Sequence, residues 1–356
     1  MSTLHPIRGR GTASNPKGRF EPLEIEPDPE LDPQEAGRPE TAYLDDGSRS
    51  VITYNTSPDV GFDASLNPYR GCEHGCSYCY ARPFHEYLGF SAGLDFETKI
   101  VVKRDAPALL RRELASPKWK PQMLALSGVT DPYQPVERRL GITRGCLEVL
   151  AEFRNPVIVV TKNHLVSRDA DLLAELAAHH AATVMISVTT LDGDLARRLE
   201  PRASHPRRRL EAIAALAAAG VPVGVLTAPI IPAVNDHEVP AIIAAAARAG
   251  ATSASYTLLR LPRGVKDIFG EWLEQHFPDR KEKVLNRLRE LRGGRLSESR
   301  FGLRMRGQGP LADHVRGLFQ LSCAKAGLGG GWPRLSAESF RRPVERGAGA
   351  QLGLFD

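Results

Sequence analysis

Short apolar runs alternate with amphipathic segments through the middle of the chain. The repeated pattern is strand, loop, helix. The run from Pro156 to Thr161 is apolar on both faces, which is typical of a strand inside a parallel sheet. Runs of this kind predict six strands: 64–66, 122–126, 156–161, 183–188, 221–226 and 251–258.

Helices are predicted between these strands. Leu210, Ile213 and Leu216 share one face of a helix at 206–219, and Gly220 follows as its C′ residue. We expect side-chain caps from Asp105, Ser167 and Asp236 on further helices, which are predicted over 105–115, 143–153, from 167 past 176, and 236–250. Six βα units with buried parallel strands predict an α/β fold, either a barrel or an open barrel.

The segments on either side of this core, residues 61–262, have different compositions. Residues 1–60 begin basic and continue into an acidic, proline-containing run, so we expect a disordered N-terminal tail. Residues 263–327 have helical spacing, with a capping-box pattern at Asp279–Glu282, and predict a helical C-terminal extension. Residues 328–356 are dominated by glycine, proline and arginine, and we expect a flexible tail.

Composition narrows the class of protein. At 42% hydrophobic and 25% charged residues the chain is typical of a soluble globular protein, and it has no apolar run that could span a membrane and no secretory start. Three of the five cysteines lie within eight residues, which argues against a disulfide framework and favours a reducing, cytoplasmic location. The net charge of +5 permits a polyanionic partner such as a nucleic acid without requiring one.

The clustered cysteines are Cys72, Cys76 and Cys79, in the spacing C-x3-C-x2-C. Thiolates are soft ligands, so three of them on one loop favour zinc, copper(I) or an iron–sulfur cluster. Gly71 and Gly75 let the backbone approach such a centre closely. Four cysteines normally fill an iron–sulfur cluster, so three leave one iron open, as in a catalytic metal site.

With Tyr78 as the aromatic residue, C-x3-C-x-aromatic-C resembles the cluster loop of the radical S-adenosylmethionine (radical SAM) superfamily. The resemblance covers about Leu66 to Leu261. It implies a partial (β/α)6 TIM-like barrel, in agreement with the six predicted units. It also implies a [4Fe-4S] cluster that cleaves SAM to methionine and a 5′-deoxyadenosyl radical. The radical would abstract hydrogen from an unidentified substrate, and a flavodoxin- or ferredoxin-type donor would reduce the cluster.

Within the superfamily, the chain resembles the spore-photoproduct-lyase-like, or DNA-repair-photolyase-like, branch. The resemblance implies that SAM contacts lie at the carboxyl ends of the strands. Each candidate also has a plain structural alternative: an ordinary turn at 127–130, a rim salt bridge at Lys162, and a backbone-bonded hydroxyl at Ser187. The residues expected to contact SAM are Tyr78, Ser127, Gly128, Thr130, Lys162 and Ser187. No catalytic side chain is assigned.

Two departures from the family pattern matter. The turn after the second strand lacks the common Gly-Gly-Glu sequence, and no cysteine stands beside Ser127 where spore photoproduct lyases place a hydrogen donor. Repair of spore photoproduct by that route is therefore not expected.

The competing hypothesis is a non-catalytic nucleic-acid-binding protein, in which His74 or His85 completes a zinc site with the cysteines. Basic residues at 280–306 would suit a phosphate backbone or simply a solvated helix face.

Cys146 is expected in the core, and burial is also the default for Cys323. Tyr69 and Tyr80 would either line the radical pocket or simply pack against other side chains. Arg202 would bind an anion or form a structural ion pair.

Overall fold

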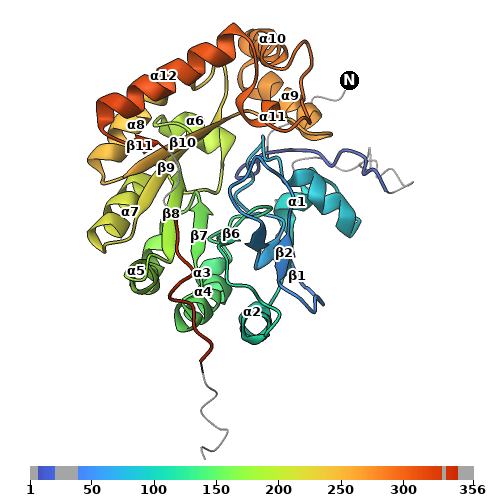
Figure 1. Ribbon diagram of the computed structural model, residues 1–356. Coiled ribbons are helices and arrows are strands. Elements are labelled where there is room, and N and C mark those ends of the chain that lie inside the picture. The colour runs from blue at the N-terminus through green and yellow to red at the C-terminus, as the bar shows by residue number, and fades with distance from the viewer. Residues whose placement is uncertain (1–6, 21–38, 331–333, 344–356) are drawn as a thin grey trace, which may run out of the picture.

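The computed structural model describes residues 7–20, 39–330 and 334–343. Its main sheet contains the six predicted strands in parallel and in sequence order (Figure 1). Each βα unit therefore adds its strand beside the previous one, as right-handed crossovers do. The strands are β3 (Ala64–Leu66), β6 (Leu124–Leu126), β7 (Val157–Thr161), β8 (Ala182–Ser187), β9 (Val223–Ile230) and β10 (Ser253–Leu258).

The two edges of this sheet are covered by short strands. At one edge β2 (Ile52–Tyr54) pairs antiparallel with β3, and at the other β11 (Gly329–Gly330) pairs parallel with β10. Among the described residues no pairing joins β2 to β11, so the barrel stays open. The expected α/β partial barrel is therefore confirmed.

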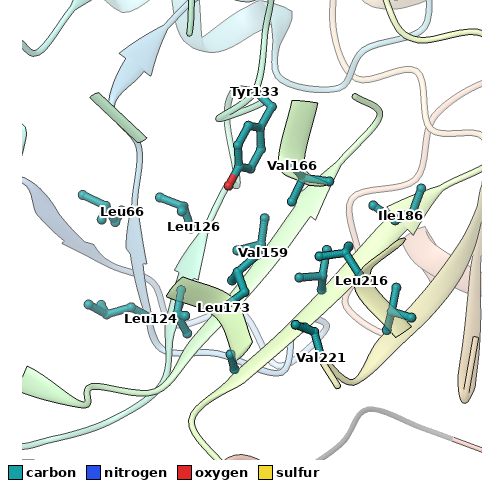
Figure 2. Close-up of a cluster of buried hydrophobic side chains, with 14 of the residues drawn as sticks. Leu66, Leu124, Leu126, Tyr133, Val159, Val166, Leu173, Ile186, Leu216 and Val221 are labelled. Carbon is teal, nitrogen blue, oxygen red and sulfur yellow. The ribbon is translucent and has the colours of Figure 1, made fainter. Parts of the chain in front are cut away.

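One face of the sheet builds the larger core with the helices outside it. Leu66, Leu126, Val159 and Val184 lie side by side in register across four strands, and all four are fully buried. Figure 2 shows Leu66, Leu126 and Val159 beside residues of the covering helices, such as Leu173 and Leu216. The covering helices are α2 (Ala106–Ala115), α4 (Ile142–Phe153), α5 (Ala170–Ala177), α7 (Pro206–Ala218) and α8 (Val239–Arg248).

The expected side-chain caps on four helices are wrong. Asp105 occupies the N-cap position of α2, but its carboxylate makes no capping hydrogen bond. Ser167 lies inside a 3-10 turn, η2 (His164–Asp169), and its hydroxyl donates to the His164 carbonyl.

Asp236 and Asp279 lie in two further 3-10 turns, η3 (Asp236–Glu238) and η4 (Pro278–Arg280). In three of the four cases a 3-10 turn moves the start of the α-helix beyond the expected cap.

The N-terminal region is not disordered where it is described. Strand β1 (Ala42–Asp45) pairs with β5 (Lys99–Val102), which pairs with β4 (Tyr69–Arg70), to form a second, three-stranded sheet. Residues 7–20, which we call the N-terminal strap, pack on the main body (dark blue in Figure 1), and the Ser14 carbonyl accepts from the Leu94 amide. The expected disorder is therefore wrong for 7–20 and 39–60, while 1–6 and 21–38 lie outside the described residues.

The C-terminal extension is helical and is fixed to the end of β10. The buried guanidinium of Arg292 donates to the carbonyls of Leu258, Leu259 and Leu303. The extension contains α9 (Val265–His276), α10 (Lys281–Leu291), α11 (Leu303–Arg306) and α12 (Pro310–Ala326). The remaining short helices of the chain are η1 (Arg82–Leu88), α1 (Asp95–Thr98), α3 (Glu137–Leu140) and α6 (Gly193–Leu199).

The expected flexible tail at 328–356 is only partly described. Besides β11, residues 334–343 are placed, and Phe340 packs on Phe153 with ring centroids 6.2 Å apart. The flexibility expected for 328–356 stays a prediction, and 331–333 and 344–356 lie outside the described residues. No helix in the described part of the chain is long and apolar enough to cross a membrane.

Candidate cofactor site

The three clustered cysteines lie on one loop, residues 71–80, which we call the cluster loop. It runs from β4 into η1, so a two-residue strand separates it from the first barrel strand. Gly71 and Gly75 have φ of +79° and +65°, conformations that glycine adopts without strain. A side chain at Gly71 would lie 3.0 Å from the Phe96 carbonyl oxygen, so this glycine also lets the loop pass close to α1.

All three thiols are free, and they are shielded from solvent to different degrees. Cys72 and Cys76 are each 7% exposed, and Cys79 is half-buried. Burial, with a further contribution from Cys72, raises the pKa of Cys79 to about 11. Burial and the nearby Glu200 carboxylate raise the pKa of Cys76 as well. Metal loading therefore has to displace thiol protons at this site.

The residues present fit an iron–sulfur cluster better than a single zinc ion. In the described part of the chain no three His, Cys, Asp or Glu side chains converge on one ion. The His74 Nδ1 lies 3.3 Å from Asp131, and the His85 ring packs against Phe90 and Phe96. His74 also interacts with Cys72, but no set of three ligands for one ion results among the described residues. A four-iron cluster needs only thiolates and spreads them more widely than one ion does.

A buried carboxylate fixes the first half of the cluster loop. Glu73 is fully buried, and its Oε1 lies 2.9 Å from an Arg202 guanidinium nitrogen. The Val136 amide donates to its other oxygen at 2.8 Å, and the Tyr43 hydroxyl donates to Oε1 at 3.1 Å. Arg202 is therefore a structural ion-pair partner rather than an anion-binding group.

A second buried carboxylate fixes the loop from the other side. Glu97 and Arg82 are both fully buried and form an ion pair. The Arg82 Nε donates to the Cys76 carbonyl at 3.0 Å, and the Gly11 amide of the strap donates to Glu97 Oε2 at 3.0 Å. The orientation of Cys76 thus depends on a charge pair that no solvent reaches.

Glu200 is the third buried carboxylate, and it links residues that follow β7 and β8, and one residue of α7, to the cluster loop. The Tyr78 hydroxyl and the Arg209 guanidinium bind it directly, and Thr189 Oγ1 donates to it at 2.6 Å. The Lys162 Nζ lies 3.6 Å from Glu200 Oε1. Burial raises the pKa of this carboxyl, but Arg209 and Lys162 outweigh burial and lower it to about 2.

The turn after β6 is bonded to the cluster loop. Thr130 Oγ1 donates to the Gly71 carbonyl at 2.7 Å, and the Tyr80 hydroxyl donates to the Gly128 carbonyl at 2.5 Å. The Ser127 hydroxyl donates to the Thr130 carbonyl at 3.2 Å, within the turn. Ser127 and Gly128 have φ of +154° and +132°, so the turn is held in a conformation that few residues adopt.

The structure thus brings the sequence-predicted residues to one end of the barrel. The turn at 127–130 follows β6, Lys162 follows β7, and Ser187 ends β8. Ser187 is buried, and its carbonyl accepts from Arg209 at 3.1 Å. Lys162 is 16% exposed and, besides approaching Glu200, donates to the Ala228 carbonyl at 3.2 Å.

The other tyrosines and cysteines singled out in the sequence differ in how deeply they are buried. Tyr69 is fully buried, and its hydroxyl bonds Glu137 at 2.5 Å, so it packs. Tyr80 is 45% exposed at the cluster loop. Cys146 is buried in the core as expected. Cys323 is half-buried and packs against the same core cluster.

The basic segment 280–306 does not form one cationic face. Arg292 is buried, and five of the other basic residues lie within 4 Å of a carboxylate: Lys281, Arg287, Arg289, Arg300 and Arg304.

Sequence reasoning missed Glu97, Glu200 and Arg209 as parts of this site. Arg209 stands in a run of three arginines at the start of α7, a pattern typical of a solvated helix end. The one signal is its spacing: Arg209 lies four residues before Ile213, on the helix face that packs against the barrel.

Residues 66–246, just over half of the chain, match the family model described as Radical SAM superfamily. The chain belongs to the radical SAM superfamily. The matched region spans the barrel from the end of β3 through β9 and ends before β10, and the predicted family is confirmed.

The chain is also similar to curated proteins and, in its fold, to solved structures. An uncharacterized protein of Mycobacterium tuberculosis is 38% identical over 232 residues, which are 65% of this chain and 67% of that protein. An uncharacterized protein of Methanocaldococcus jannaschii is 27% identical over 222 residues, 62% of this chain and 79% of that protein. Spore photoproduct lyase complexed with dinucleoside spore photoproduct has a TM-score of 0.57 at 16% identity, over 81% of this chain and 80% of that chain.

Membership fixes the coarse chemistry. Radical SAM enzymes use a [4Fe-4S] cluster and SAM, and this chain is such an enzyme. The likeness to spore photoproduct lyase shows the shared fold.

Proposed function

We propose that Cys72, Cys76 and Cys79 hold the [4Fe-4S] cluster and that SAM binds beside it, across the carboxyl ends of β6, β7 and β8. The observation that carries this proposal is the single loop with three free, shielded thiols, bonded directly to the turn after β6. When bound, the reduced cluster and SAM supply a 5′-deoxyadenosyl radical that abstracts hydrogen from the substrate. The SAM contacts would be Tyr78, Ser127, Gly128, Thr130, Lys162 and Ser187.

The chain's own residues hold this site rigid. Glu200 fixes the Tyr78 hydroxyl, so that the ring stays beside the thiols, and Thr130 fixes the Gly71 carbonyl at the start of the loop. The Lys162 ammonium lies 5.9 Å from the centre of the Tyr78 ring and is partly exposed. It can therefore bind a ligand carboxylate while remaining close to Glu200.

We further propose that the substrate is a single-stranded nucleic acid. At the mouth of the barrel the Arg260 guanidinium lies 5.4 Å from the centre of the half-exposed Tyr80 ring. Within the described ranges no carboxylate lies at ion-pair distance from Arg260, whose other contact is the Met305 sulfur at 3.3 Å. Next to it Arg304 lies 4.5 Å over the exposed Phe301 ring, but its guanidinium is already paired with Asp59, so Arg260 is the cation available to a ligand.

Guanidinium groups beside exposed rings suit phosphates beside bases. The spore photoproduct lyase that shares this fold is complexed with a dinucleoside photoproduct, which supports a related class of substrate. Because no cysteine stands beside Ser127, spore photoproduct itself is not the substrate we propose.

An external electron donor and a reducing, cytoplasmic setting belong to the same proposal. All five cysteines are free thiols, and three of them would be lost to cluster binding if they were oxidised.

The test is anaerobic reconstitution with iron and sulfide, followed by reduction with dithionite and SAM. We expect a brown protein with acid-labile sulfide that forms 5′-deoxyadenosine. A colourless protein that holds one zinc ion and cleaves no SAM would overturn the proposal and favour the zinc-stabilised alternative.

The substrate is tested separately, with deuterated single-stranded oligonucleotides. We expect deuterium to appear in 5′-deoxyadenosine. Its absence with both DNA and RNA strands, while SAM cleavage continues, would overturn the substrate class alone.

A further inference from the structure

The N-terminal strap lies directly against the outer side of the cluster loop. A side chain at Gly11 would place its β-carbon 1.6 Å from the Gly75 carbonyl oxygen, so the two backbones are in contact. The neighbouring Arg10 donates to the Glu97 carbonyl at 3.1 Å. Gly75 stands between Cys72 and Cys76 in the sequence. The strap is therefore in direct contact with the part of the loop that carries these two thiols.

A pocket of about 430 Å³ opens beside the strap. Its walls are the strap residues Ile7 to Arg10, part of α6 with the following Pro201, and His276 at the end of α9. Four arginines line it, and its single carboxylate, Asp194, is already paired with one of them. The arginines are Arg8, Arg10, Arg197 and Arg198.

The positive charge of this pocket is not balanced by its own walls. Burial and the nearby Arg202 lower the pKa of the Arg10 guanidinium, and burial and Arg198 lower the pKa of His276. Burial is the larger cause of both shifts, a nearby arginine adds to each, and Glu97 and Glu73 oppose the shift of Arg10 only in part. A negatively charged partner would relieve this repulsion.

Two backbone contacts connect the pocket wall to the cluster loop. One is the contact of Gly11 with Gly75, and the other is the Arg202 amide, next to Pro201 of the wall, which donates to the His74 carbonyl at 3.2 Å. A redox group held at this pocket would therefore lie close to the loop that carries the thiols, outside the barrel.

We propose that this arginine pocket docks the acidic face of the protein that reduces the cluster, a flavodoxin- or ferredoxin-type donor. The inference rests on the proposed assignment of the cluster to Cys72, Cys76 and Cys79. One electron leaves the reduced donor, which is oxidised by one electron, and the cluster is reduced by one electron; no covalent bond forms or breaks.

The lining of the pocket favours a protein carboxylate surface over a nucleic acid. It contains no Phe, Tyr or Trp on which a base could stack, in contrast to the barrel mouth with Tyr80 and Phe301. Cationic side chains at the rim of an interface mainly speed association with an acidic partner, and this effect falls with salt.

The experiment reverses two exposed charges, Arg8→Glu together with Arg198→Glu, in the reconstituted holoenzyme. Lys118→Glu, on the exposed loop after α2, is the matched charge-reversal control. The rate of 5′-deoxyadenosine formation is measured with limiting reduced flavodoxin, with limiting reduced ferredoxin, and with excess dithionite. Direct binding of flavodoxin and ferredoxin is measured by calorimetry at low and high salt.

We expect the double variant to lose roughly tenfold in the rate driven by at least one donor protein, and to bind that donor correspondingly more weakly at low salt. The dithionite-driven rate should equal that of the wild type, and Lys118→Glu should change nothing. Arg8→Lys with Arg198→Lys should restore donor binding, because the interaction is one of charge.

Three results would overturn the docking site. Binding and rates with both donors could be unchanged in the double variant, or the dithionite-driven rate could fall equally. The variant could also lose affinity only for single-stranded DNA, which would make the pocket a nucleic-acid contact. A wild-type protein inactive even with dithionite would instead refute the proposed cluster assignment.

Discussion

The cluster loop and the barrel mouth are both rich in charge, but they use it in opposite ways. Around the cluster loop Glu73, Glu97 and Glu200 are fully buried, and each is bonded to an arginine. At the mouth Arg260 and Arg304 lie over aromatic rings, and Arg260 has no carboxylate partner within the described ranges.

This difference distinguishes charges that position the cluster loop from charges that can bind a substrate. A buried charge is stable only with its partner, so it fixes geometry and cannot exchange that partner for a ligand. Arg260 lies beside a ring and has no carboxylate partner within the described ranges, so its hydrogen-bond donors stay available, whereas Arg304 is paired with Asp59. We therefore assign the buried pairs to holding the thiols and Arg260 to binding substrate, and the following experiments test that division.

The largest effect is expected from Cys76→Ala. Removing one of only three thiols should abolish cluster retention, so iron content and 5′-deoxyadenosine formation should fall to the level of the metal-free protein. Iron analysis and a SAM-cleavage assay measure this. Cys146→Ala, in the core of α4, is the control and should keep both; a Cys76 variant that still cleaves SAM would refute the site.

Glu200→Gln should be the most destabilising change among the buried carboxylates. It leaves Arg209 buried without its counter-charge and weakens the hold on Lys162, which costs about 3–5 kcal/mol in the free energy of unfolding. Urea unfolding of the metal-free protein measures the cost. Glu211→Gln, in an exposed pair with Arg208, should cost less than about 1 kcal/mol. Equal losses would show that burial of Glu200 is unimportant.

The same carboxyl predicts a dependence of stability on pH. Its pKa is about 2 in the folded protein, whereas the ordinary value for a glutamate, which holds in the unfolded chain, is 4.5. As the pH falls below 4.5 the unfolded state takes up the proton first, so the stabilisation is complete above this pH and is lost towards pH 2. The loss amounts to about 3 kcal/mol, and it should be missing from the unfolding of Glu200→Gln.

Gly11→Ala should weaken the contact between strap and cluster loop. The added carbon would lie 1.6 Å from the Gly75 carbonyl oxygen, so one backbone has to move, at a cost of about 1–3 kcal/mol. Urea unfolding and the rate of iron loss to a chelator measure it. Gly47→Ala, where an added carbon meets nothing within 4 Å, should leave both unchanged; an equally harmless Gly11→Ala would mean that the strap is loosely held.

The smallest effect is expected from Arg260→Gln at the mouth. Losing one phosphate contact should reduce the salt dependence of single-strand binding by about 0.7 in log–log slope. Titration of a fluorescent oligonucleotide at several salt concentrations measures it. Arg316→Gln, which removes an exposed partner of Asp313 on α12, should leave the slope unchanged. An unchanged slope for Arg260→Gln would remove this residue from the nucleic-acid contact.

The repeated strand and helix pattern was sufficient to predict the fold. All six barrel strands were placed from apolar runs such as 156–161, because a strand buried on both faces has few polar positions. The spacing of Cys72, Cys76 and Cys79 identified the family for a similar reason, since local spacing alone determines which side chains share a loop.

Long-range partners could not be predicted in this way. Three of the four expected helix caps are wrong because a 3-10 turn and an α-turn begin with the same residue types, and Asp105 occupies its N-cap position without making the capping bond. The strap was expected to be disordered because it is polar, yet Gly11 is held by a hydrogen bond to Glu97, 86 residues away. The pairing of Glu200 with Lys162 likewise depends on β7 lying beside β8, which composition does not reveal.

The strap also sets an order of events during synthesis. Its Ser14 hydroxyl bonds Glu271 of α9, a residue made 257 positions later. On the ribosome the barrel strands, the cluster loop and its thiols therefore emerge before this bond can form. The strap's bonds to Glu97 and Leu94 can form earlier, so the bond to Glu271 is the later step that joins the strap to the C-terminal extension.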